Sequence, residues 1–224
     1  MDPTVFVIDD DPRMRRAINR LLGSYGYSAH VFASASEFLA RELPSGPACL
    51  ILDLKMPEIG GLDVQQVLAQ SENELPIIFI SGQADVISSV RAMKAGAIDF
   101  LTKPFDDKDL ISAVQLALAR SQKMREDRIA LQRDLEAFKK LTPREKEVCV
   151  GIARGLLNKQ VGYELGTTEK TVKAQRARVM QKLGAESLAD VVRLVERLRT
   201  AGAIAPTPPE PDVPPQVRAA SAKN

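Results

Sequence analysis

The sequence predicts an α/β domain with a doubly wound parallel sheet, followed by a smaller all-α domain. Five short apolar runs alternate with amphipathic segments in the first ~120 residues, which is the pattern of repeated strand–helix units. The first and third runs are continuous, as in parallel strands that are buried on both faces. The charge balance then changes, because residues 1–105 carry 9 Lys and Arg against 13 Asp and Glu, whereas residues 141–200 carry 12 against 7. The second part is therefore expected to meet a polyanion.

The composition fits two small globular domains, since the 224 residues are 45% hydrophobic and 27% charged. No apolar run approaches the ~20 residues that cross a bilayer, and the N-terminus leads directly into a strand instead of a signal sequence. We therefore expect a cytoplasmic protein without a membrane partner. A single histidine and two cysteines about a hundred residues apart argue against zinc sites and histidine-based catalysis.

The first two strand–helix units are expected between residues 4 and 39. Residues 4–8 form a continuous apolar strand, and Pro12 is a favoured first residue for the helix that follows and ends near residue 23. Residues 29–32 read as a second short strand. Ser34 then caps a helix that extends to residue 39.

Three more strands complete the predicted sheet. Residues 49–53 are an apolar run that ends on a carboxylate, and a helix over 62–71 follows. Residues 76–80 form the fourth strand, and the helix over 85–95 carries its apolar residues on one face. The last strand, residues 99–103, is short and ends on a lysine.

Polar side chains stand at the carboxyl ends of these strands, where ligands bind in open α/β sheets. They are Asp9, Asp10, Asp53, Ser81 and Lys103. If the first and third strands are neighbours, as in the flavodoxin-like order 2-1-3-4-5, the carboxylates converge and repel one another. A hard cation with oxygen ligands relieves that repulsion, so Mg²⁺ is the expected cofactor. Taken alone, Asp53 also fits a residue that merely caps the next turn.

The motifs VIDDD, DLKMP, SG and TKP, at their spacing over residues 4 to about 120, resemble the receiver domain of response regulators. The resemblance implies that Asp53 accepts a phosphoryl group from a sensor histidine kinase. It also implies that Mg²⁺ is bound by Asp10, Asp53 and the backbone carbonyl of Lys55, with Asp9 acting through a bound water.

The same resemblance assigns three further residues. Ser81 and Lys103 would contact the phosphoryl oxygens, with a cis peptide bond before Pro104, and Ser81 and Phe100 would form the switch that responds to phosphorylation. Three alternatives remain: a flavodoxin-like domain with an acidic rim, a metal-dependent phosphohydrolase that uses Asp53, and a DNA-binding protein whose receiver domain is inert.

A continuous helix is expected over residues 106–140, which contain no Gly or Pro. Met124, Leu131 and Phe138 recur every seven residues, as in a helix that pairs with a second one. Ser121 and Arg128 interrupt the accompanying seam. Residues 121–140 are therefore interpreted as a helical linker, either a coiled coil or a solvated spacer.

A second domain is expected from residue 141, because Thr142 and Glu145 form a capping box around Pro143. Four helices are predicted: residues 143–154, 158–165, 169–183 and 187–198. A short turn at Gly166 separates the second from the third, as in a helix-turn-helix. The third helix is rich in Lys and Arg, as a recognition helix would be, although a solvated basic face has the same composition.

The segments LTPREKEV, GLLNKQV, ELG and KTVKAQRARVMQKL, over residues 141–200, resemble the LuxR-type helix-turn-helix. The resemblance implies binding to double-stranded DNA, with Lys159 on a phosphate and Lys173 at the base edges. The residues expected at the interface are Lys159, Lys170, Thr171, Lys173, Ala174, Gln175, Arg176 and Arg178. Gln175 stands where the family usually has His, which affects base preference more than binding itself.

Together the two halves resemble a response regulator of the NarL/FixJ type, a transcription factor that phosphorylation controls. This implies a homodimer in the phosphorylated state and RNA polymerase as a further candidate partner, while catalysis would be limited to Mg²⁺-dependent self-phosphorylation and dephosphorylation. The expected domains are residues 1–120, 121–140 and 141–200, and a disordered tail over 201–224, which holds six of the fourteen prolines.

Overall fold

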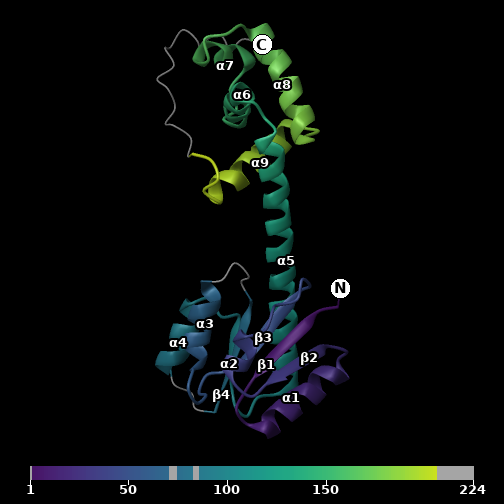
Figure 1. Cartoon of the computed structure of the whole chain (residues 1–224), viewed down its shortest axis with the longest axis vertical. Coiled ribbons are helices and arrows are strands. Elements are labelled where there is room, and N and C mark those ends of the chain that lie inside the picture. The colour runs from purple at the N-terminus through teal and green to yellow at the C-terminus, as the bar shows by residue number, and fades with distance from the viewer. Residues whose placement is uncertain (1, 71–74, 83–85, 206–224) are drawn as a thin grey trace. The chain divides into compact units, whose positions relative to one another are not determined.

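The computed structural model describes residues 2–70, 75–82 and 86–205, and the chain divides into two compact units, Met1–Asp127 and Arg128–Asn224 (Figure 1). The expected tail lies outside the described residues from residue 206 onward, as do the expected helix boundaries at residues 71 and 85. Within the described ranges no helix is both long and apolar enough to cross a membrane.

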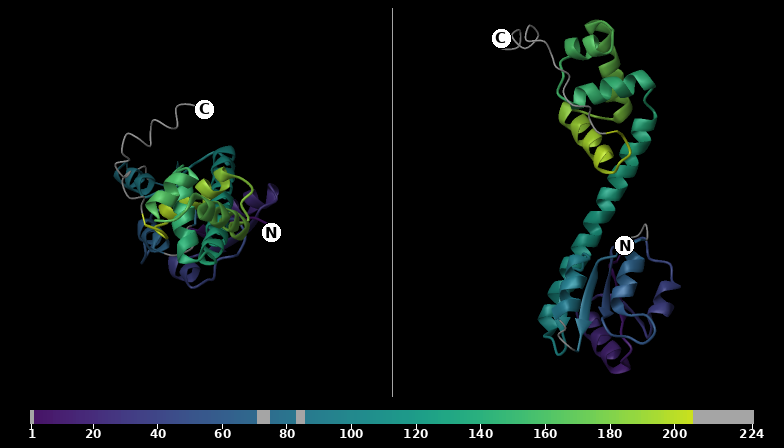
Figure 2. Two further views of the ribbon diagram at one scale, coloured as in Figure 1. Left: turned by 90° about the horizontal axis from the view of Figure 1, so that it is seen from above. Right: turned by 90° about the vertical axis from the view of Figure 1, so that its left-hand side faces the viewer.

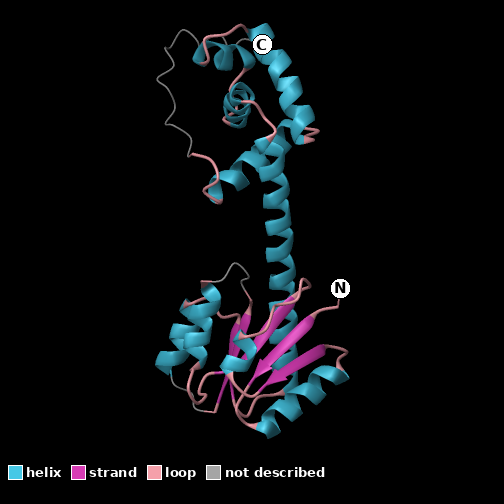
Figure 3. Cartoon of the chain, viewed as in Figure 1, coloured by secondary structure: helices cyan, strands magenta, loops and turns pink. Residues whose placement is uncertain are grey.

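Unit 1 contains a five-stranded sheet whose neighbouring strands all run parallel (Figure 3). Its strands are β1 (Thr4–Ile8), β2 (Ser28–Phe32), β3 (Ala48–Asp53), β4 (Ile77–Ser81) and β5 (Asp99–Thr102). They lie in the order β2-β1-β3-β4-β5. The predicted doubly wound sheet, with its first and third strands as neighbours, is confirmed.

Helices cover both faces of this sheet, as the right-hand view of Figure 2 shows. They are α1 (Pro12–Ser24), α2 (Ala35–Leu39), α3 (Gly61–Ala69), α4 (Val86–Lys94) and α5 (Asp107–Lys139). Ile18 of α1 and Val114 of α5 belong to the core on one face, whereas Phe38, Val64 and Ala92, from the other three helices, belong to the core on the opposite face. Every residue of the central strand β3 is buried between these two cores, which explains its continuous apolar run.

The start of α3 packs directly against the end of β3. A Cβ atom added to Gly61, the first residue of α3, would lie 2.6 Å from the carbonyl oxygen of Asp53 and 3.0 Å from a ring carbon of Phe79. Only glycine leaves room for this approach. Gly61 therefore fixes the short connection that follows Asp53 against the sheet.

Helix α5 contributes to both units. The backbone N–H of Ala48 donates a hydrogen bond to Ser121 Oγ at 3.0 Å, so this part of α5 is fastened to β3 in unit 1. Leu131, Leu135 and Phe138 pack with the core of unit 2. Two of the three side chains at heptad spacing thus have partners within their own unit.

Up to residue 205, unit 2 consists of the end of α5 and four helices, which confirms the predicted all-α domain. The helices are α6 (Pro143–Ala153), α7 (Asn158–Glu164), α8 (Glu169–Leu183) and α9 (Leu188–Thr200). The capping box at the start of α6 forms as expected, because Thr142 Oγ1 accepts a bond from the N–H of Glu145 and the Glu145 carboxylate accepts one from the N–H of Thr142. Arg197 of α9 pairs with Asp134 of α5 at 2.6 Å.

Replacing Gly61 with Ala is expected to destabilise unit 1 by about 1–3 kcal/mol, because the new methyl group overlaps backbone atoms that cannot move away easily. Urea unfolding followed by circular dichroism measures the change. Gly23→Ala in α1 is the control, since its added Cβ would meet no atom within 4 Å, and it should leave stability unchanged or raise it. Equal effects of the two substitutions would contradict the close approach.

Candidate functional site

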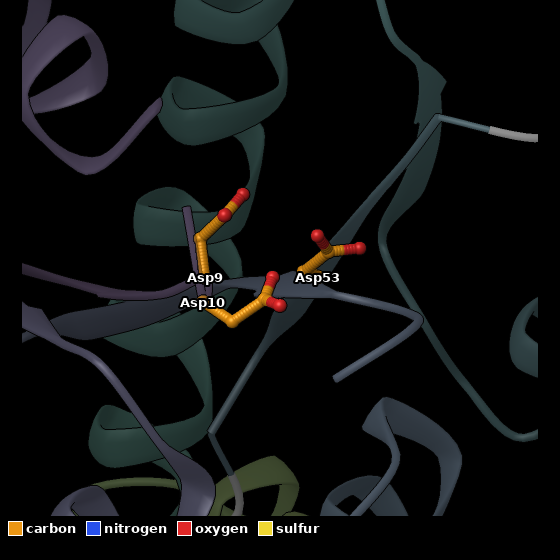
Figure 4. Close-up of side chains that lie close together, drawn as sticks. All are labelled: Asp9, Asp10 and Asp53. Carbon is orange, nitrogen blue, oxygen red and sulfur yellow. The ribbon is translucent and has the colours of Figure 1, made fainter. Parts of the chain in front are cut away.

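Three aspartates gather where β1 and β3 end (Figure 4). Asp9 and Asp10 follow β1, and Asp53 is the last residue of β3. Because β1 and β3 pair in register, with Ile8 opposite Leu52, the two strands end side by side. One carboxylate oxygen from each aspartate lies within 4.8 Å of the others, so the predicted cluster is present.

Lys103 joins two of these aspartates. Its Nζ donates to Asp9 Oδ2 and to Asp53 Oδ2, each at 2.7 Å. The lysine directly follows the edge strand β5, and its backbone N–H donates to the carbonyl oxygen of Ser81 at 2.7 Å. The Lys103–Pro104 peptide bond is cis, as the receiver resemblance implied. One ammonium therefore bridges two carboxylates that are 94 and 50 residues away in the sequence.

In this cluster, burial and the neighbouring charges shift the pKa values of Asp9 and Lys103 in opposite directions. Asp9 is completely buried, and this desolvation raises the pKa of its carboxyl group despite the nearby Lys103 ammonium. For Lys103, burial alone would lower the pKa, but the hydrogen bonds to Asp53 and Asp9 outweigh it and the pKa is raised. The lysine is thus held in its charged form by the two acids.

Backbone groups hold the other oxygens of the buried carboxylates. The N–H of Asp11 donates to Asp9 Oδ1 at 2.8 Å, and the N–H of Lys55 donates to Asp53 Oδ1 at 3.2 Å. Arg15 of α1 donates to the carbonyl oxygen of Asp9 at 2.6 Å. We did not predict this contact from the sequence, where only the position of Arg15 one turn into the helix behind the acidic run could have suggested it.

Ser81 and Phe100, the expected switch residues, lie on β4 and β5. Ser81 is completely buried and ends β4, the strand next to β3. Phe100 is half-buried, and its ring stacks on Phe79 with 6.3 Å between the ring centroids. The structure brings Ser81 to the same edge of the sheet as Asp53, whereas Phe100 lies within its strand and contacts the core.

The cluster has the ligand chemistry of a magnesium site. It offers three carboxylates against one ammonium, so negative charge remains for a cation to offset. Asp10 is exposed while Asp9 and Asp53 are buried, which leaves the cluster open on one side. Carboxylate and carbonyl oxygens are the ligands that Mg²⁺ prefers, and no His or Cys takes part in the cluster. The residues present therefore fit this ion.

In unit 2, α7 and α8 form a helix-turn-helix. A Cβ atom on Gly162 would lie 2.9 Å from the carbonyl oxygen of Thr167, so glycine allows α7 to approach the turn closely. Gly166 takes the left-handed conformation, with φ of 63°. Thr168 caps α8 by accepting a hydrogen bond from the N–H of Thr171 at 3.2 Å.

Most of the expected DNA contacts lie on the surface of these two helices. The exposed ones are Lys159, Lys170, Thr171, Lys173, Ala174 and Arg178. Gln175 and Arg176 are half-buried. Arg176 donates to Asn158 Oδ1 of α7 at 3.3 Å, and Gln175 Oε1 is buried without a hydrogen-bond partner. Arg176 thus contacts the neighbouring helix α7. Its position in a basic helix did not predict this contact.

Two family models match the chain, one in each unit. Residues 5–115 match the response regulator receiver domain. Residues 139–195 match the luxR family of bacterial regulatory proteins. The two matches cover the acidic cluster and the helix-turn-helix, respectively.

Similar proteins share both halves. Nodulation protein W of Bradyrhizobium diazoefficiens is 46% identical over 87% of this chain and 86% of that protein. Response regulator protein TodT of Pseudomonas putida is 42% identical over the same shares. The low-resolution structure of response regulator StyR matches with a TM-score of 0.74 and 42% identity, covering 88% of this chain and all of that one.

The alignments to nodulation protein W and to TodT each cover 87% of this chain, so they extend over parts of both family matches. The chain therefore belongs to the two-component response regulators of the NarL/FixJ type, a family of transcriptional regulators.

Proposed function

We propose that Asp53 accepts a phosphoryl group from a sensor histidine kinase and that the modified protein binds specific DNA sequences through α7 and α8 to regulate transcription. The observation that carries the proposal is the ammonium of Lys103, which bridges Asp9 and Asp53 at 2.7 Å each. An acid cluster with a fixed cation at the carboxyl ends of parallel strands suits a group that is transferred as an anion.

In the proposed transfer, a carboxylate oxygen of Asp53 attacks the phosphorus, and the bond between phosphorus and the donor's nitrogen breaks, leaving its electron pair on the donor. Lys103 would neutralise the phosphoryl oxygens, and Ser81, on the adjacent strand, would donate a hydrogen bond to one of them. Asp9, Asp10, Asp53 and the carbonyl of Lys55 would hold Mg²⁺, which offsets negative charge on the phosphoryl oxygens when bound. Asp9 would act through a bound water.

Phosphorylation would then shift the populations of two conformations. Transfer to Asp53 changes the acid that Lys103 contacts, and the new oxygens draw in Ser81, so that the ring of Phe100 repacks. The shift is no larger than the difference in interaction energy of the phosphoryl group with the two states. We propose that the altered surface near β4 and α4 favours a homodimer, which would present two recognition helices.

On DNA, the exposed basic residues of α8 would enter the major groove while Lys159 of α7 contacts a phosphate. RNA polymerase is a further candidate partner, and the proposed location is the cytoplasm. The chemistry of the protein itself would be restricted to self-phosphorylation and dephosphorylation.

The rival proposal is that the protein is a phosphohydrolase, which requires repeated turnover of phosphomonoesters.

A small phosphodonor with Mg²⁺ is expected to add one phosphoryl group to the wild-type chain and none to Asp53→Asn, because the amide is a poor nucleophile. Intact mass spectrometry counts the added groups. Asp107→Asn, at an exposed position in the first turn of α5, is the control and should be labelled like the wild type. Unchanged labelling of Asp53→Asn would remove Asp53 from its proposed role.

Lys159→Ala and Lys173→Ala should weaken DNA binding in different ways. Loss of a phosphate contact at Lys159 lowers affinity for all sequences and reduces the salt slope by about one unit. Loss of a base contact at Lys173 costs about 1–3 kcal/mol on the specific site and relaxes specificity. Binding isotherms at several salt concentrations separate the two effects, with Lys139→Ala on α5 as the control. If both variants lost the same affinity on specific and random DNA, the division of roles would be refuted.

A further inference from the structure

Glu145 is a buried carboxylate with two different partners. Only 4% of the residue is exposed. Its Oε2 accepts a hydrogen bond from the backbone N–H of Thr142 at 2.8 Å, which closes the capping box of α6. The same oxygen accepts a second bond from Lys182 Nζ, near the end of α8, at 2.6 Å. The bond from Lys182, followed by that from Thr142, lowers the pKa of Glu145 to about 2, so the carboxylate stays charged at neutral pH.

Lys182 belongs to the recognition helix but lies far from the residues expected at the bases. It stands nine residues after Lys173, roughly 13 Å farther along the helix axis. Recognition helices of this type contact base edges mainly with their N-terminal residues. Lys182 is exposed, as Lys170 and Lys173 are, but its ammonium donates to the buried carboxylate of Glu145. The ion pair with Glu145, rather than a base contact, therefore accounts for the position of the ammonium.

The apolar contacts of α8 come from a few of its residues. Of its fifteen residues, three are buried: Val172, Val179 and Leu183. Such contacts are non-directional, so they define the rotation of a helix less sharply than a bond of fixed direction does. A charge-assisted hydrogen bond has a defined direction and length. Near the N-terminal half of α8, the bond from Arg176 to Asn158 provides one directional contact. The pair of Glu145 and Lys182 provides another at the opposite end.

We propose that the ion pair between Glu145 and Lys182 sets the rotation of α8, and thereby which side chains of the recognition helix face the bases. Glu145 is then a positioning residue for sequence discrimination, although it touches no DNA. This inference rests on the proposed binding of specific DNA by unit 2. The carboxylate of this pair is buried, and the lysine side chain is 36% exposed. Exposed and buried ion pairs both contribute little net stability, whereas a pair with a buried member can fix one geometry among several.

Two single variants and their combination test the pair in the full-length, phosphorylated chain. Glu145→Gln keeps the capping box, because glutamine serves at that position as well as glutamate, and removes only the charge. Lys182→Met removes the ammonium and keeps the length of the side chain. DNA sites are first enriched from a random library with the wild type. Affinities for an enriched site and for random DNA are then measured at several salt concentrations.

Both variants are expected to lose about tenfold in discrimination between the enriched site and random DNA, the effect of one misplaced base contact. The salt slope should remain that of the wild type, because no phosphate contact is lost. The double variant should lose no more than either single one, since all three lack the same interaction. Circular dichroism at the assay temperature verifies folding, and Glu145→Gln decides the outcome if Lys182→Met does not fold.

Asp134→Asn is the matched control. Asp134 is also buried and pairs with Arg197 at 2.6 Å, but this pair joins α5 to α9 and does not touch α8. Its loss should lower stability and leave discrimination unchanged. An equal loss of discrimination in Asp134→Asn would show a merely structural role for Glu145 and overturn the inference.

The remaining outcomes are equally decisive. A salt slope reduced by about one unit in Lys182→Met would make Lys182 a phosphate contact. Wild-type discrimination in Glu145→Gln would overturn the inference alone, with the proposed function intact. If the wild type enriched no sites, the proposed binding of specific DNA would fail first.

Discussion

The contact on which unit 1 depends is the bridge from Lys103 to Asp9 and Asp53. Two carboxylates are buried within reach of each other, an arrangement that costs several kcal/mol per charge unless a cation compensates it. The parallel pairing of β1 with β3 brings the acids together, and the edge strand β5 delivers the lysine to the same edge of the sheet. Gly61 lets α3 close against the end of β3, so the backbone around Asp53 is fixed. The arrangement leaves negative charge and one open side, and both properties suit phosphoryl transfer.

The buried carboxylates of unit 2 differ from those of unit 1 in the balance of charge around them. Asp134 and Glu145 are each buried, and each has a basic partner of its own, at 2.6 Å in both cases. In each pair the positive charge offsets the negative one, so no negative charge remains to attract a bound cation. The cluster in unit 1 has three acids and one lysine. This difference in charge balance distinguishes the proposed site of phosphoryl transfer from ion pairs that join helices.

Local patterns in the sequence were sufficient to predict the helices and strands of both units. Continuous apolar runs predicted the strands, and the capping box of Thr142 and Glu145 predicted the start of α6. The carboxylates at strand ends converge as expected, because strand order alone decides that. The contacts of Arg15, Arg176 and Lys182 escaped prediction, since each depends on which helix lies opposite a long flexible side chain.

The heptad spacing in α5 has the same limitation. It correctly indicates an apolar face at Leu131 and Phe138, but a repeat cannot state whether that face meets a second copy or another helix of its own chain. In the structure both side chains pack within unit 2.

The central claim, that the Lys103 ammonium compensates the aspartates as a bound Mg²⁺ would, is tested most directly by thermal unfolding of wild type and Lys103→Met, each with and without Mg²⁺. Without the ion we expect the variant to unfold at a lower temperature than the wild type, and we expect Mg²⁺ to raise its midpoint by the larger amount. Identical midpoints without the ion, and identical increases with it, would contradict the claim.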